Sequence, residues 1–129
     1  MVIEMKKWFN KKNNVYKYTD EELAEIMYDK QLVFVPEIEV AEVLYSYDKS
    51  KRYVILKNNN GTYTYIYERI IPLDEDEINL LCLQENFLPA YWCEDGDKHC
   101  HLYNTHQDAL NGIFEEPNYK IYFKKEDDK

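Results

Sequence analysis

Three amphipathic segments, each preceded by a residue that caps helices, predict three short helices. In the first, Thr19 is followed three residues later by Glu22, and at this spacing both side chains can bind the free amides of a helix start. Leu23, Ile26 and Met27 then recur at helical spacing. This helix should therefore extend to about residue 30 and turn its apolar side toward the core.

The second and third helices carry the same signal. Asp74 and Glu77 form the second capping pair, and the apolar residues at positions 78–83 predict a helix buried over a wide arc, with Cys82 as a small core residue. Thr105 caps the third helix. Its apolar positions are Ala109, Leu110, Ile113 and Phe114.

Runs of β-branched and aromatic residues between the helices predict strands. We expect strands over residues 32–35, 39–47, 52–57, 62–71, 90–93, 99–103 and 119–123. Residues 1–18 fit either a helical stripe or a strand pair, and we favour the pair. Asn59, Asn60 and Gly61 tolerate positive φ and so predict a tight hairpin. Pro117 should end the third helix.

Together these elements predict an α+β fold, with a mainly antiparallel sheet of about five or six strands packed against three short capped helices. We expect one globular domain over residues 1–124 and a frayed tail over residues 125–129. The sequence has no apolar run long enough for a membrane span and no secretory signal, and its three cysteines favour free thiols. We therefore expect a cytoplasmic protein without membrane contact.

Charge is distributed unevenly along the chain, whose formal net charge is −9. Residues 72–116 hold eleven carboxylates and a single cation, Lys98. A surface of one sign attracts partners of the opposite sign and repels phosphates, so we expect no direct binding of nucleic acid.

These features favour a non-enzymatic, acidic protein-binding module. By analogy with the small acidic proteins with which bacteria neutralise toxins and phages block host enzymes, we expect an inhibitor or immunity-type protein. Its partner would be a nuclease or another protein with a basic, nucleic-acid-handling surface, whose cations the carboxylates would occupy by mimicking phosphate charge. The candidate partner-binding residues are Asp74, Glu75, Asp76, Glu77, Tyr91, Trp92, Glu94, Asp95, Asp97 and Tyr103.

The alternative is a regulatory domain that binds a small molecule or zinc. Tyr63, Tyr65 and Tyr67 would line one side of their strand, either as a ligand face or as a cover for the sheet beneath a helix. A second set has zinc-binding side chains without the usual paired spacing. Its members are Cys93, His99, Cys100, His101 and His106. The sequence indicates no cofactor and no catalytic group, because its carboxylate pairs are explained by helix capping and its glycines are isolated.

Overall fold

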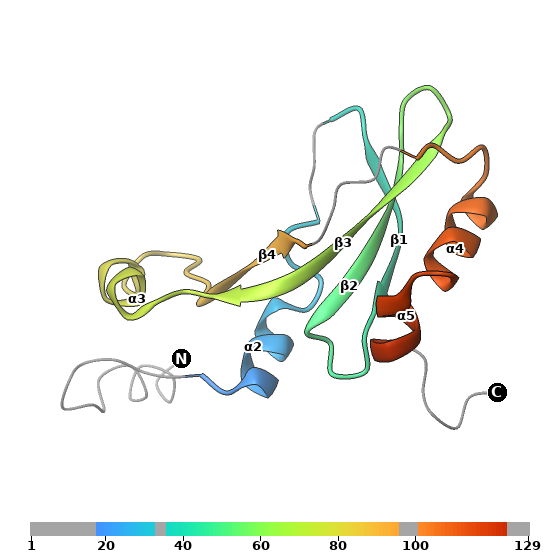
Figure 1. Cartoon of the computed structure of the whole chain (residues 1–129). Helices are drawn as coiled ribbons and strands as arrows, with labels where there is room; N and C mark the ends of the chain where they lie inside the picture. Colours follow the sequence, from blue (N-terminus) through green and yellow to red (C-terminus); the bar gives the residue numbers. More distant parts are fainter. Residues whose placement is uncertain (1–17, 33–35, 96–100, 124–129) are drawn as a thin grey trace.

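The computed structural model describes residues 18–32, 36–95 and 101–123, which form an antiparallel sheet with helices on both faces (Figure 1). Its helices are α2 (Asp20–Met27), α3 (Glu75–Leu81), α4 (His106–Phe114) and α5 (Pro117–Tyr122). Its strands are β1 (Glu39–Tyr45), β2 (Lys51–Lys57), β3 (Tyr63–Pro72) and β4 (Ala90–Glu94). The order across the sheet is β1-β2-β3-β4. The α+β class is confirmed, but the described residues form four strands rather than the predicted five or six, and four helices rather than the predicted three.

The hairpin of β2 and β3 is the centre of the sheet, and its two strands are joined by the tight turn that the sequence predicts. Tyr53, Val54 and Ile55 are at most 1% exposed, because β2 has a neighbouring strand on each side and packed side chains on each face. The Asn58 N–H donates to the Thr62 carbonyl over 2.8 Å, and Gly61 has φ of +89° in the turn between them.

One face of the sheet packs beneath α4. Tyr53, Ile55 and Tyr65 form a buried cluster with Ala109 and Ile113, both of which are fully buried. The tyrosines at positions 63 and 67 pack against the same cluster from its edge. The row of tyrosines therefore covers the sheet beneath a helix, and this is one of the two roles that the sequence left open, the other being a ligand face.

The other face packs against α2. Leu23 and Met27 contact Ala90 and Trp92, and the Trp92 indole donates from Nε1 to the Met27 carbonyl over 2.8 Å. Thr19 and the residue three positions later form the predicted capping box. The helix is shorter than predicted and ends at Met27.

A buried arginine on this face connects the sheet to the segment that follows α2. Arg52 is 0% exposed, and its Nε lies 2.7 Å from Glu68 Oε1. Its guanidinium also donates to the Lys30 and Gln31 carbonyls and lies 4.1 Å from the centre of the Trp92 ring. Because a buried charge requires partners on every side, this arrangement fixes the connection that follows α2.

The strand predicted for residues 119–123 is wrong, since residues 117–122 form α5. Pro117 begins this helix rather than only ending the one before it, because proline lacks the N–H that the first helical residue does not use. Tyr119 and Phe123 lie one helical turn apart, and the centres of their rings are 5.7 Å apart. The segment that was predicted as a strand from its alternating residues therefore also contains two aromatic residues at helical spacing.

The strand predicted for residues 99–103 is not seen in its described part, where Tyr103 forms a single bridge to Tyr63. Residues 101 and 102 have no regular structure, so this segment is not a second strand of a β4 hairpin. The predictions for residues 1–17, 33–35 and 124–129 lie outside the described residues. Within the residues that the structure describes, no helix is long and apolar enough to cross a membrane.

Candidate functional site

The helix α3 occupies the end of the molecule opposite α4 and α5 (Figure 1). The predicted capping box is present, with the Glu77 N–H donating to Asp74 Oδ1 over 2.8 Å and the Asp74 N–H donating to Glu77 Oε1 over 3.0 Å. These bonds satisfy amides that a helix start leaves free, and the acidic first turn suits the positive end of the helix dipole. The sequence thus explains why a helix begins here.

The predicted burial of α3 is wrong. Leu80 and Leu83 are 79% and 75% exposed. Within the helix itself, residues 75–81, the buried residue is Ile78. Cys82 is half-buried rather than a core residue. The physical reason is that β3 ends at Pro72, so the sheet stops before it can provide a surface for this helix.

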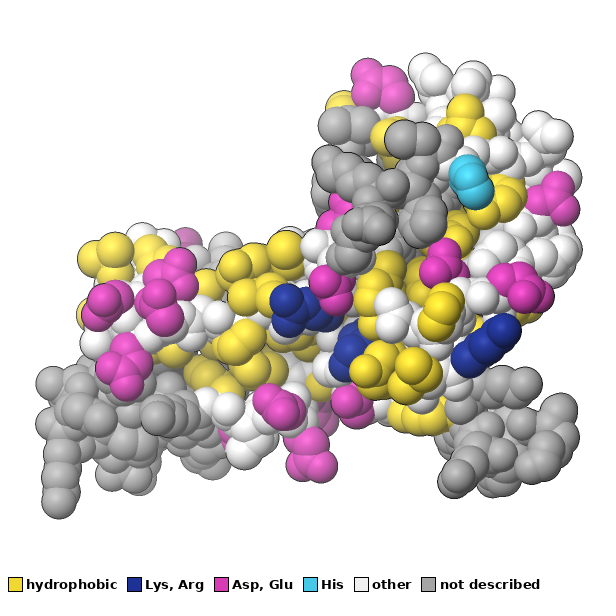
Figure 2. Space-filling model, in the orientation of Figure 1, with side chains coloured by type: hydrophobic (Ala, Val, Ile, Leu, Met, Phe, Trp, Pro, Cys, Tyr) yellow, Lys and Arg dark blue, Asp and Glu magenta, His cyan; other side chains and the backbone are white. Residues whose placement is uncertain are grey.

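The outward side of α3 combines apolar and acidic groups. Asp76 and Leu80 are four residues apart and therefore lie on the same side of the helix, whereas Ile78 points toward the interior. Figure 2 shows acidic side chains beside hydrophobic ones at this end of the molecule, and further acidic side chains elsewhere on the same face.

The α3 carboxylates form no ion pair with any cation among the described residues. The side chains at positions 74–77 are all exposed, and the ion pairs that the structure describes lie elsewhere. We define the α3 surface as the four acidic residues together with the two exposed leucines. Its members are Asp74, Glu75, Asp76, Glu77, Leu80 and Leu83.

The second acidic segment lies apart from the α3 surface. The β3–β4 register places Ala90 opposite Pro72 and Glu94 opposite Glu68, so Glu94 is the length of β4, about 13 Å, from the strand end beside α3. Asp95 forms an ion pair with Arg69 over 3.2 Å. The two acidic segments therefore do not form one continuous patch.

The three aromatic candidates occupy different environments. Tyr91 is 41% exposed and lies opposite Ile71 near the α3 end of the strand pair. Trp92 is 4% exposed, so it belongs to the core beneath α2 and is not available as a surface anchor. Tyr103 packs against the α4 core at the far end of β3, and Asp97 lies outside the described residues.

The candidate zinc ligands are only partly described, and the described ones do not gather around a common centre. Cys93 is exposed on β4 and His101 is exposed before α4. The His106 Nε2 lies 2.7 Å from Glu42 Oε1 on β1. His99 and Cys100 lie outside the described residues, and the described part of the chain contains no group of three metal-binding side chains.

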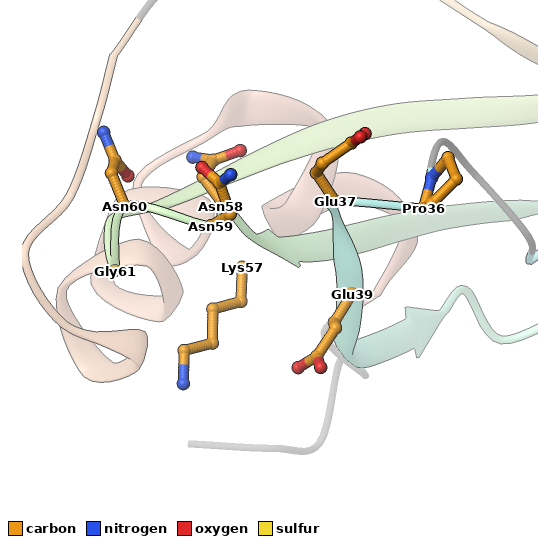
Figure 3. A pocket seen from close by; sticks show the side chains of 8 residues that line it. All are labelled: Pro36, Glu37, Glu39, Lys57, Asn58, Asn59, Asn60 and Gly61. Atoms are coloured by element: carbon orange, nitrogen blue, oxygen red, sulfur yellow. The ribbon is translucent and has the colours of Figure 1, made fainter.

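An open pocket of about 570 Å³ lies between the start of β1 and the β2–β3 turn (Figure 3). It is lined by Pro36, Glu37, Glu39, Lys57, Asn58, Asn59, Asn60 and Gly61. Figure 3 shows that Glu37 and Glu39 point in opposite directions. A small-molecule site needs polar groups that converge on a ligand, and this pocket does not show that convergence.

The tyrosines beneath α4 are held in their neutral form. Burial raises the pKa of Tyr67 to about 12, and burial also raises the pKa of Tyr53 and of Tyr65. The Tyr65 hydroxyl in addition donates to Glu116 over 2.5 Å, which favours the protonated phenol. These side chains act as packing groups in the cluster beneath α4.

Comparison with protein-family models, curated proteins and solved structures finds no match for this chain. The functional argument therefore depends on the residues and their arrangement. The feature that sequence reasoning missed is the exposure of Leu80 and Leu83. Their apolar character predicted burial, and no local signal distinguishes them from the leucines of a buried helix.

Proposed function

We propose that this protein is a non-enzymatic protein-binding module whose contact surface is the α3 surface. The observation that supports this proposal is the presence of exposed leucines among carboxylates that have no described cationic partner. The proposed role is that of an inhibitor or immunity-type protein, which occupies a basic surface on a nuclease or another nucleic-acid-handling protein.

The two kinds of side chain contribute differently to such a contact. The carboxylates create a field that accelerates encounter with a basic surface, while buried apolar anchors slow dissociation. Leu80 and Leu83 are the apolar groups that a partner would bury. Large apolar side chains clustered at a surface and surrounded by polar ones are typical of protein-binding sites.

A nucleic-acid-handling partner fits the charge of the α3 surface. Proteins that bind nucleic acid carry lysine and arginine at their phosphate-binding sites, and carboxylates compete for those cations. The partner would therefore combine a basic rim with an apolar contact for the leucines.

Affinity capture with the full chain from its native cells would identify the partner, and association rates would then test the role of α3. Replacing Glu75→Gln together with Asp76→Asn should lower the association rate severalfold at low salt, because the carboxylates steer encounter. The matched control is Glu21→Gln together with Glu25→Gln, which removes two exposed charges from α2.

Association rates that fall equally in the two double variants would contradict the assignment of α3. A rate that does not change with ionic strength would contradict electrostatic steering altogether.

A further inference from the structure

The chain contains two Asn-Gly pairs, and the fold places them in different environments. Asn60 and Gly61 lie exposed in the turn between β2 and β3, whereas Asn111 and Gly112 lie within α4. Glycine after asparagine favours deamidation, because it has no Cβ to hinder attack of its nitrogen on the asparagine side chain. The structure therefore decides which of the two pairs can react in the folded protein.

We propose that Asn60 is a site of spontaneous deamidation in the folded protein. The Gly61 nitrogen loses its proton and attacks Cγ of Asn60, so that a C–N bond forms. The Cγ–Nδ2 bond then breaks, and Nδ2 leaves as ammonia with a proton. Water opens the resulting succinimide ring to give aspartate or the β-linked isoaspartate. The reaction consumes only water and involves no residue of α3, so it is independent of the proposed function.

Two groups of Thr62 bind the oxygen that gains charge in this reaction. The Thr62 N–H donates to Asn60 Oδ1 over 3.0 Å, and the Thr62 hydroxyl donates to the same oxygen over 2.7 Å. Attack on Cγ moves electron density onto Oδ1, so donors that already point at this atom stabilise the tetrahedral intermediate. The Thr62 hydroxyl in turn accepts from Asn58 Nδ2 over 3.1 Å, which orients it toward Asn60.

The Gly61 nitrogen can be freed without unfolding the protein. Its N–H donates to the Asn58 carbonyl over 3.0 Å, and this bond has to open before the nitrogen can lose its proton. A single hydrogen bond in an exposed turn opens at little cost in free energy. Asn60 and Gly61 also line the open pocket of Figure 3, through which water and base reach them.

The second Asn-Gly pair is protected by α4. Gly112 is an interior residue of this helix, so its N–H is held in the hydrogen-bond ladder. Freeing that N–H would unwind a helix in which Ala109 and Ile113 are fully buried against the sheet. Asn111 Oδ1 accepts from Gln107 Nε2 over 3.0 Å, which directs the Asn111 amide toward the preceding turn and away from the Gly112 nitrogen.

The products change the turn in two different ways. Isoaspartate inserts a further carbon atom into the main chain of a turn whose length fixes the register of β2 and β3. Aspartate keeps the main chain but adds a carboxylate to a pocket that Glu37 and Glu39 already line. Deamidation at Asn60 therefore alters the hairpin or the charge of the pocket beside it.

Peptide mapping by mass spectrometry of the unmodified full chain tests the proposal. The protein is incubated at mildly alkaline pH, both folded and in guanidinium chloride, and the conversion of each asparagine is followed over time. In the folded protein, Asn60 should react severalfold faster than Asn111, whereas in the denaturant the two rates should be similar because both residues precede glycine. Asn59 is exposed in the same turn but precedes Asn60, so it should stay intact. Equal rates at the two Asn-Gly pairs of the folded protein, or faster reaction at Asn111, would overturn the proposal.

Two variants test the contribution of the Thr62 hydroxyl, with the rate at Asn111 as the internal reference. Thr62→Val removes the hydroxyl and keeps the N–H, so reaction at Asn60 should slow severalfold. Thr62→Ser keeps both donors and should react like the unmodified protein. If Asn60 reacts as fast in Thr62→Val as in Thr62→Ser, while Asn111 stays protected in both, the role of the hydroxyl is overturned.

Discussion

The helices α3 and α4 start from similar sequence signals and end in opposite environments. Each begins at a side-chain cap and continues with apolar residues at helical spacing. In α4, Ile113 is 0% exposed, whereas Leu80 of α3 is 79% exposed. The difference arises because α4 lies across the tyrosine face of the sheet, while α3 begins after β3 has ended. An amphipathic pattern predicts a helix, but burial also requires a surface for that helix to cover.

The largest expected effect of this difference is on stability. Ile113→Ala should lower the free energy of unfolding by about 2–5 kcal/mol, because it leaves a cavity between α4 and the sheet. Leu80→Ala should change it by less than about 0.5 kcal/mol, because the side chain is already in water. Urea denaturation of both variants would measure the two values. Similar losses would show that α3 contributes to the core after all.

A smaller loss of stability is expected from a substitution at Gly112, where α4 lies close to the tyrosines. A Cβ at Gly112 would lie 2.6 Å from the Tyr103 hydroxyl and 3.3 Å from the Tyr65 ring. Gly112→Ala should therefore lower the free energy of unfolding by about 1–3 kcal/mol through steric overlap, although alanine favours helices.

Asn79→Ala is the matched substitution in α3, where the side chain is exposed. It should raise the free energy of unfolding by about 0.5 kcal/mol through helix propensity alone. A stabilising effect of Gly112→Ala would contradict the close packing of α4 on the tyrosines.

Local signals in the sequence were sufficient for much of the fold. The caps at Thr19, Asp74 and Thr105 all formed as predicted, because a cap depends on residues within one turn. The turn at Gly61 also formed, since it needs a residue that tolerates positive φ. Such features can be read from a few neighbouring positions.

What the sequence did not indicate depends on contacts between distant segments. The burial of Arg52 requires Glu68 on the next strand and main-chain carbonyls from the connection after α2. The exposure of Leu80 depends on where β3 ends, and the separation of the α3 carboxylates from Glu94 depends on the β3–β4 register. The α3 surface could therefore be predicted as acidic from the sequence, but its apolar part could not.

The smallest expected effect is on the dependence of stability on pH. We compare a carboxylate that accepts hydrogen bonds from its neighbours with one of the α3 carboxylates. Burial alone would raise the pKa of Asp48, but hydrogen bonds from the Ser50 main chain and from the Ser50 and Ser46 hydroxyls outweigh it and lower that pKa. The folded state therefore binds the Asp48 proton less readily than the unfolded state does. The resulting stability is present above the ordinary pKa of 3.8 and is lost as pH falls through the folded value.

Urea denaturation between about pH 6 and about pH 3 would measure this contribution, because the range covers the titration of an ordinary aspartate. Asp48→Asn should weaken the dependence of stability on pH over this range, since it removes the titrating group. Asp76→Asn on α3 removes an equal charge without breaking a hydrogen bond that the structure describes. The stability of this variant should therefore depend on pH in nearly the same way as that of the unmodified protein. If Asp76→Asn weakened the dependence as much as Asp48→Asn, then the α3 carboxylates would be engaged within the folded molecule, and their availability to a basic partner would be lost.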